Sequence, residues 1–190
     1  MGSLTEEQKS ILIGCLLGDG SMRKKRNALL EINHCFDQKV LVDWMFFKFK
    51  EYTITNPKWR RTNGRREAYR FVTQSLPVFT PFYDQFFNKG KKIVPTNLKL
   101  SALALAVWFM DDGSKSRSSI YLNTQQFSKK EQLYLIDLLL KKFGIESTLN
   151  KDKIYLRIRI RTRSIGRFIK QVEPFVLEEF KYKIPSVMTP

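Results

Sequence analysis

Residues Ile11–Gly20 read ILIGCLLGDG, and residues Ala104–Gly113 read ALAVWFMDDG. Each stretch is an apolar run that ends in Asp-Gly, and its acids Asp19 and Asp112 lie 112 − 19 = 93 residues apart. An apolar run closed by glycine is typical of a buried helix and the turn that follows it. Two such runs in one chain indicate an internal repeat.

Other short stretches recur in the same order and at nearly the same offset. The matches are Phe36–Lys39 with Phe127–Lys130, Thr73–Leu76 with Thr162–Ile165, Pro81-Phe82 with Pro174-Phe175, and Lys91–Ile93 with Tyr182–Ile184. Because five ordered matches rarely arise by chance, we predict two copies of one unit, residues 1–97 and 98–190.

Local signals give both units the same order of elements. Capping boxes are predicted at Thr5 with Gln8 and at Ser128 with Glu131, and Gly144 is a suitable helix C-cap. Further N-caps are predicted at Asp37, Ser75 and Ser164, a hairpin turn at Asn63-Gly64, and strands at Leu29–Cys35, Ala68–Thr73, Ile120–Thr124 and Ile154–Thr162. The prediction is an α+β fold of two pseudo-symmetric αββαββα units, with helices on one face of each antiparallel sheet.

The charge of the chain indicates a polyanionic partner. Lys and Arg number 34 against 18 Asp and Glu, a net charge of +16. The basic residues are spread through elements that look folded, so nucleic acid is favoured over an anionic membrane surface. No run approaches the roughly 20 apolar residues of a membrane span, and the N-terminus has no secretory pattern. Cys15 and Cys35 form no CxxC motif, which favours a reducing compartment, and His34 alone cannot build a zinc site.

The stretch Ile154–Arg163 is predicted to present a basic face. Its apolar side chains alternate with Tyr155, Arg157, Arg159, Arg161 and Arg163, so a strand would place those five on one side. A solvated surface is the ordinary explanation of such a charge run. Arginine, however, offers a bidentate fork for phosphate or guanine that solubility alone does not require.

The first unit contains a similar set of polar side chains. The candidates for DNA contact are Glu31, Asn33, Arg66, Arg70 and Gln74. We therefore expect the sheet face of each half to read one half-site of a nucleic-acid duplex.

The two Asp-Gly stretches resemble the paired motifs of LAGLIDADG homing endonucleases, in particular the intron-encoded branch with two repeats in one chain. Further resemblance lies in Trp108–Lys115, Leu122–Phe127 and Tyr182–Pro185, so that it covers essentially the whole chain. The second motif has Val107 where the first has Gly14, and we expect this valine to loosen the contact between the two motif helices.

The resemblance implies a saddle of antiparallel sheets on DNA, with the motif helices side by side at its centre. Asp19 and Asp112 would then be catalytic and would bind Mg²⁺, with Mn²⁺ as a substitute. Lys92 and Lys183 are implied to lie near the cleavage pocket, with Gln38 as a solvent organiser and Lys129 as its counterpart. The implied reaction is a double-strand break in a long, imperfectly palindromic site during intron homing.

Two other functions share this family fold. An RNA maturase would bind its host intron, and a silent DNA-binding regulator would be expected to lack the two acids that remain here. The expected partners are double-stranded DNA and, for a maturase, intron RNA, and a monomer is expected. The expected location is intracellular, in a mitochondrion, a chloroplast or a bacterial cytoplasm.

Overall fold

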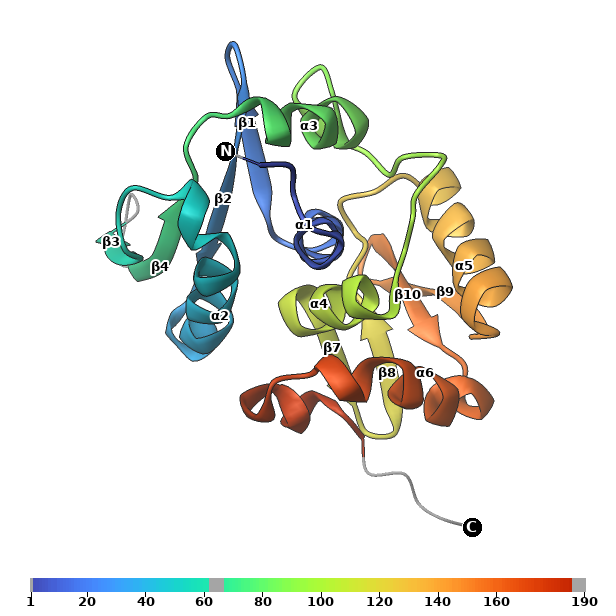
Figure 1. Ribbon diagram of the computed structural model, residues 1–190. Helices are drawn as coiled ribbons and strands as arrows, with labels where there is room; N and C mark the ends of the chain where they lie inside the picture. The colour runs from blue at the N-terminus through green and yellow to red at the C-terminus, as the bar shows by residue number, and fades with distance from the viewer. Residues whose placement is uncertain (1, 62–66, 186–190) are drawn as a thin grey trace.

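The computed structural model describes residues 2–61 and 67–185 of the chain, and it contains one pattern of helices and strands twice (Figure 1). The first copy has α1 (Glu6–Leu17), β1 (Ser21–Lys24), β2 (Ala28–His34), α2 (Lys39–Phe49), β3 (Lys58–Arg61), β4 (Glu67–Val72) and α3 (Thr80–Phe86). The second has α4 (Ala102–Asp112), β7 (Gly113–Ser116), β8 (Ser119–Leu122), α5 (Lys129–Phe143), β9 (Ser147–Asp152), β10 (Tyr155–Ile160) and α6 (Ile165–Val172). The predicted order of elements is confirmed, while the boundary at residue 97 stays a prediction.

Both main sheets are antiparallel and have the same topology. Their strand orders are β1-β2-β4-β3 and β7-β8-β10-β9, and a short hairpin of β5 (Phe87–Asn88) and β6 (Lys91–Lys92) follows the first copy. Short 3-10 turns link several elements, at Phe36–Gln38, Lys50–Tyr52, Pro77–Phe79, Thr162–Ser164, Glu173–Phe175 and Glu178–Lys183. Alternation along β2 buries Leu30, Ile32 and His34 on its helix side, so each sheet has one core face and one open face.

Helices α1 and α4 lie side by side at the centre of the molecule, between the two sheets (Figure 1). A Cβ atom added to Gly14 of α1 would lie 2.5 Å from the carbonyl oxygen of Ala104 and 2.6 Å from Cβ of Val107 on α4. The expectation that Val107 loosens this contact is therefore wrong. Gly14 lies directly opposite Val107, and the space that the glycine leaves is the space that the valine fills.

The capping predictions have mixed outcomes. The capping boxes at Thr5 and Ser128 are present, and Gly144 ends α5 in the left-handed conformation that glycine favours. The N-caps predicted at Asp37 and Ser75 are wrong, because 3-10 turns begin near both and no side-chain cap forms. The Ser164 hydroxyl likewise caps nothing and instead accepts a hydrogen bond from the Glu146 amide.

Two sequence predictions lie outside the described residues, namely the Asn63-Gly64 turn and the DNA contact of Arg66. Within the described ranges, no helix combines the length and the apolar character that crossing a membrane requires.

Candidate active site

The ends of α1 and α4 bring the two predicted catalytic acids to one place. Asp19 follows Gly18, the C-cap of α1, and Asp112 is the last residue of α4. Asp19 as a whole residue is exposed, but its carboxyl group is partly shielded from solvent, and this raises its pKa. The negative charge of Asp111 raises the pKa of Asp19 further. Burial and then the charge of Asp19 raise the pKa of Asp112 to about 7. Each carboxylate therefore carries its charge at a cost, and the C-terminal ends of two helix dipoles add to that cost.

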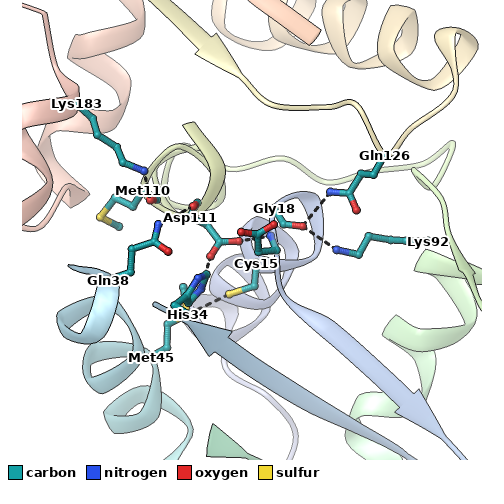
Figure 2. A network of polar contacts seen from close by, with 11 residues as sticks. Cys15, Gly18, His34, Gln38, Met45, Lys92, Met110, Asp111, Gln126 and Lys183 are labelled. Carbon is teal, nitrogen blue, oxygen red and sulfur yellow. Dashed lines mark hydrogen bonds and ion pairs between the residues drawn. The ribbon is translucent and has the colours of Figure 1, made fainter. Parts of the chain in front are cut away.

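A lysine from each half contacts the end of its own motif helix (Figure 2). The Nζ atom of Lys92 donates to the carbonyl oxygen of Gly18 at 2.7 Å, and that of Lys183 donates to the carbonyl oxygen of Met110 at 2.6 Å. Burial lowers the pKa of both lysines, and nearby aspartates oppose this effect by favouring the charged form. The structure thus brings both lysines close to Asp19 and Asp112, and their roles in cleavage stay predictions.

Two glutamines cross from one half to the other at the same level. Nε2 of Gln38 donates to the carbonyl oxygen of Asp111 at 3.1 Å, and Nε2 of Gln126 donates to the carbonyl oxygen of Gly18 at 3.0 Å. These carbonyls occupy equivalent motif positions, 93 residues apart. Gln126 therefore makes the contact equivalent to that of Gln38, while the solvent-organising role of Gln38, with Lys129 as its counterpart, stays a prediction.

A buried ion pair that was not predicted lies between the halves. Nε2 of His34 is 2.7 Å from Oδ1 of Asp111, in a contact that is close but poorly aligned as a hydrogen bond. Burial opposes the positive charge of His34, but Asp111 outweighs burial, so the pKa of His34 is raised. Oδ2 of Asp111 accepts a hydrogen bond of 2.5 Å from the backbone N–H of Asp19.

The carboxylate oxygens of Asp19 and Asp112 fit a hard divalent cation whose remaining ligands are water and substrate phosphate. Asp19 and Asp112 offer carboxylate oxygens, and a cation between them would relieve the cost that raises both pKa values. Among the described residues, no cluster of three or more His, Cys, Asp or Glu side chains could hold a metal ion alone. Such sites are typical of Mg²⁺, which retains waters and takes ligands from substrate phosphates.

The open face of the first sheet carries three of the predicted polar residues, Glu31, Asn33 and Arg70. Asn33 lies opposite Arg70 in the β2–β4 register, and Gln74 follows the end of β4. Nη1 of Arg70 lies 2.9 Å from Oε1 of Glu31, whose other oxygen lies 2.8 Å from Nη2 of Arg23. Arg23 shares this face, and sequence reasoning missed it because β1 is too short to show a period.

The second sheet presents a shorter basic row than predicted. Arg157 and Arg159 lie on β10 with Tyr155, but the strand ends at Ile160. Arg161 is the N-cap of the following 3-10 turn, and Arg163 lies within that turn. Arg163 forms an ion pair with Glu146. Ile154, expected in the core, is 83% exposed because it lies in the hairpin turn before β10.

Neighbouring strands complete this second face. The guanidinium carbon of Arg157 lies 4.1 Å from the centroid of the Tyr121 ring, and Nη2 of Arg159 donates to Oγ of Ser119 at 3.0 Å. Asn123, one position beyond β8, donates through Nδ2 to Oδ1 of Asp112 at 3.2 Å and so joins the sheet to the acid. The repeat could have identified Asn123 as a site residue. It directly follows β8, at the position that corresponds to Asn33 on β2.

Proteins of similar sequence include DNA endonucleases and mRNA maturases. A family model described as the LAGLIDADG DNA endonuclease family matches residues 9–168. The chain is 30% identical over 197 residues to probable intron-encoded endonuclease 1 of Wickerhamomyces canadensis, which covers 96% of this chain and 85% of the relative. It is 28% identical over 199 residues to cytochrome b mRNA maturase bI2 of Debaryomyces hansenii, over 97% of this chain and 76% of the relative.

Two solved structures share the fold of the chain. The homing endonuclease I-WcaI bound to its DNA recognition sequence superposes with a TM-score of 0.91 at 29% identity, over 98% of this chain and 90% of that one. I-DmoI in complex with DNA and Mn shares the fold at a TM-score of 0.57 and 14% identity, over 87% of this chain and 96% of that one. The chain belongs to the LAGLIDADG DNA endonuclease family.

Proposed function

We propose that this protein is a monomeric, Mg²⁺-dependent endonuclease that makes a double-strand break at one long, pseudo-palindromic DNA site during intron homing. One observation carries the proposal: each half contributes one acid, one lysine and one basic sheet face to a shared centre. Because a single chain supplies both halves, no second copy is needed to cut two strands. The two faces differ in their side chains, so the two half-sites of the target are expected to differ as well.

Asp19 and Asp112 would hold the metal, which when bound would supply Lewis-acid stabilisation of the phosphate charge. Lys92 and Lys183 place ammonium groups beside the same acids, where each can neutralise negative charge developing on a phosphate. Gln38 and Gln126 fix the carbonyl ends of the motif helices, and so hold the acids at one level. Mn²⁺ is the expected substitute ion, and an organelle or bacterial host stays a prediction.

The sheet faces would bind and orient the duplex. Arg157 and Arg159 in the second half, and Arg70 with Asn33 in the first, present hydrogen-bond donors of the kind that read base edges in a major groove. In the first half, Glu31 forms ion pairs with Arg70 and Arg23. These pairs hold the guanidinium groups of Arg70 and Arg23 in place before DNA binds. Lysine and arginine elsewhere in the chain would add contacts to phosphates that depend on salt but not on sequence.

The experiment begins with a target selected by binding from a randomised duplex library and cloned in a supercoiled plasmid. We expect the wild-type protein to linearise it with Mg²⁺ and to stop when EDTA is added. Asp19→Asn and Asp112→Asn should bind the target but no longer linearise it. Asp137→Asn is the matched control, since Asp137 pairs with Lys141 on the exposed side of α5 and such pairs contribute little. Cleavage by either active-site variant at the wild-type rate would overturn the proposal.

The likeness to a cytochrome b mRNA maturase supports a second candidate, in which the chain binds intron RNA and assists its folding. The same variants separate the two functions. A maturase would keep its effect on intron splicing in Asp112→Asn, whereas an endonuclease would lose its activity.

A further inference from the structure

The ion pair of His34 and Asp111 is the most deeply buried charged contact beside the candidate active site. His34 lies on β2 of the first half and Asp111 on α4 of the second, and their side chains are only 2% and 0% exposed (Figure 2). Groups this deeply buried cannot touch DNA. Their cost of desolvation is large, so a role for the pair must come from what it does to its neighbours.

Asp111 connects the pair to the backbone of Asp19. Its Oδ2 atom accepts the hydrogen bond from the Asp19 amide, while its Oδ1 atom faces His34. Gly18 makes this approach possible, because a Cβ atom at that position would lie 2.1 Å from Oδ2 of Asp111. A hydrogen bond to a charged acceptor is stronger than one between neutral groups, so it restrains the turn that carries Asp19.

The second half has no copy of this arrangement. The residue equivalent to His34 is Thr124, whose hydroxyl donates within its own half to Oε1 of Gln132 at 2.9 Å. Asp112 is instead held by Asn123, which donates through Nδ2 to its carboxylate and through its backbone N–H to its carbonyl oxygen, each at 3.2 Å. The carboxylate of Asp112 therefore has a direct partner, whereas Asp19 is restrained through its backbone N–H.

We propose that Asp111 and His34 are positioning residues for Asp19, and that they set the cleavage rate of one DNA strand separately from that of the other. The proposal rests on the endonuclease function proposed above. Asp111 supplies the acceptor for the Asp19 amide, and His34 balances the charge of Asp111. Loss of the acceptor lets the turn at Asp19 shift, and a shift of about 1 Å at a reacting centre costs on the order of 100-fold in rate.

The experiment compares the two strands of one target, each labelled at its 5′ end, in time courses with Mg²⁺. The test variant is Asp111→Ala combined with His34→Thr, which removes the acceptor without leaving a buried charge alone. The rescue variant is Asp111→Asn, which keeps an acceptor oxygen at the same place. Asn123→Ala is the mirror variant, because it frees the carboxylate of Asp112 and leaves the amide of Asp19 held.

We expect the test variant to change the ratio of the two strand rates by about 10-fold or more, with nicked plasmid accumulating before linear product. Asp111→Asn, whose neutral oxygen accepts a weaker hydrogen bond, should lie closer to the wild-type ratio than to that of the test variant. Asn123→Ala should shift the ratio in the opposite direction. Equal slowing of both strands in the test variant, or an Asp111→Asn ratio as altered as that of the test variant, would overturn the proposal.

A second measurement separates this inference from the endonuclease function. Hydrogen exchange of the Asp19 amide, followed by NMR, should be slow in the wild-type protein and at least about 10-fold faster in the test variant, because an amide without its acceptor exchanges freely. If the wild-type protein cuts no DNA, the proposed endonuclease function is wrong. The exchange rate of the Asp19 amide would still show whether Asp111 and His34 position Asp19. Unchanged exchange in the test variant would refute the positioning role.

Discussion

Replacing Asp112 with asparagine should make the metal-free protein more stable while it abolishes cleavage. The pKa of Asp112 is about 7 in the folded protein, against an ordinary value of 3.8. A carboxyl with a raised pKa binds its proton more tightly when folded. Its unfavourable contribution is therefore absent below about pH 4, grows as the pH rises to 7, and is complete above 7.

The size of the effect follows from that difference in pKa. About 3 pKa units correspond to roughly 4 kcal/mol at pH 8, at 1.36 kcal/mol for each unit. Asp112 is only half-buried, and screening by solvent reduces this to about 2 kcal/mol. For a chain of this length, that is an increase in Tm of about 4–8 °C. Asparagine preserves the hydrogen bond from Asn123, so no partner is lost.

The assay is thermal unfolding of the wild-type protein and Asp112→Asn at pH 5 and pH 8, with EDTA and with Mg²⁺. We expect the variant to be more stable at pH 8 with EDTA, to keep about a third of that advantage at pH 5, and to be much less stabilised by Mg²⁺. A variant that melts at or below the wild-type temperature at pH 8 in EDTA would show that the acid is not under electrostatic strain, and the reasoning would fail.

Three further predictions concern other parts of the molecule. Lys183→Met should lower the cleavage rate about 100-fold with unchanged affinity for DNA, as single-turnover kinetics and gel-shift titrations would show; a parallel loss of binding would argue against a role in cleavage. Gly14→Ala should lower the free energy of unfolding by about 1–3 kcal/mol in urea, because its Cβ would lie 2.5 Å from the Ala104 carbonyl; an unchanged midpoint would contradict the close contact. Arg157→Lys should weaken target binding about 10-fold with the same salt dependence, since it keeps the charge but not the planar stack on Tyr121. A change in the slope of affinity against salt would point to a lost phosphate contact instead.

Local sequence signals predicted the parts of the fold that depend on near neighbours. Capping boxes such as Thr5 with Gln8 are complete within four residues, and the Asp-Gly motifs locate both acids at helix ends. Predictions at the ends of strands were less accurate. Alternation in the sequence continues from Ile154 to Arg163, but the chain turns at both ends of β10, and nothing in the alternation marks those turns.

Contacts between the halves could not be predicted from the repeat. The match of Phe36 with Phe127 aligns Gln38 with Lys129, but the chain enters α2 through a 3-10 turn, so the equivalent carbonyl is reached by Gln126. The pair of His34 and Asp111 breaks the repeat altogether. These two residues are 77 positions apart (111 − 34) and meet only because α1 and α4 pack together. Matching one half to the other finds only what the halves share, so it cannot reveal a contact whose residues differ between them.

Between α1 and α4, small residues on one helix face larger ones on the other, and this determines which halves can pair. Gly14 meets Val107 and Gly18 meets Asp111, and in each pair the two positions are 93 residues apart and so correspond in the repeat. A homodimer of the second half would force valine against valine and carboxylate against carboxylate, whereas one of the first half would leave gaps at both levels. Separately expressed halves should therefore assemble with each other and not with themselves. The contact between the motif helices thus makes the two halves complementary and not interchangeable.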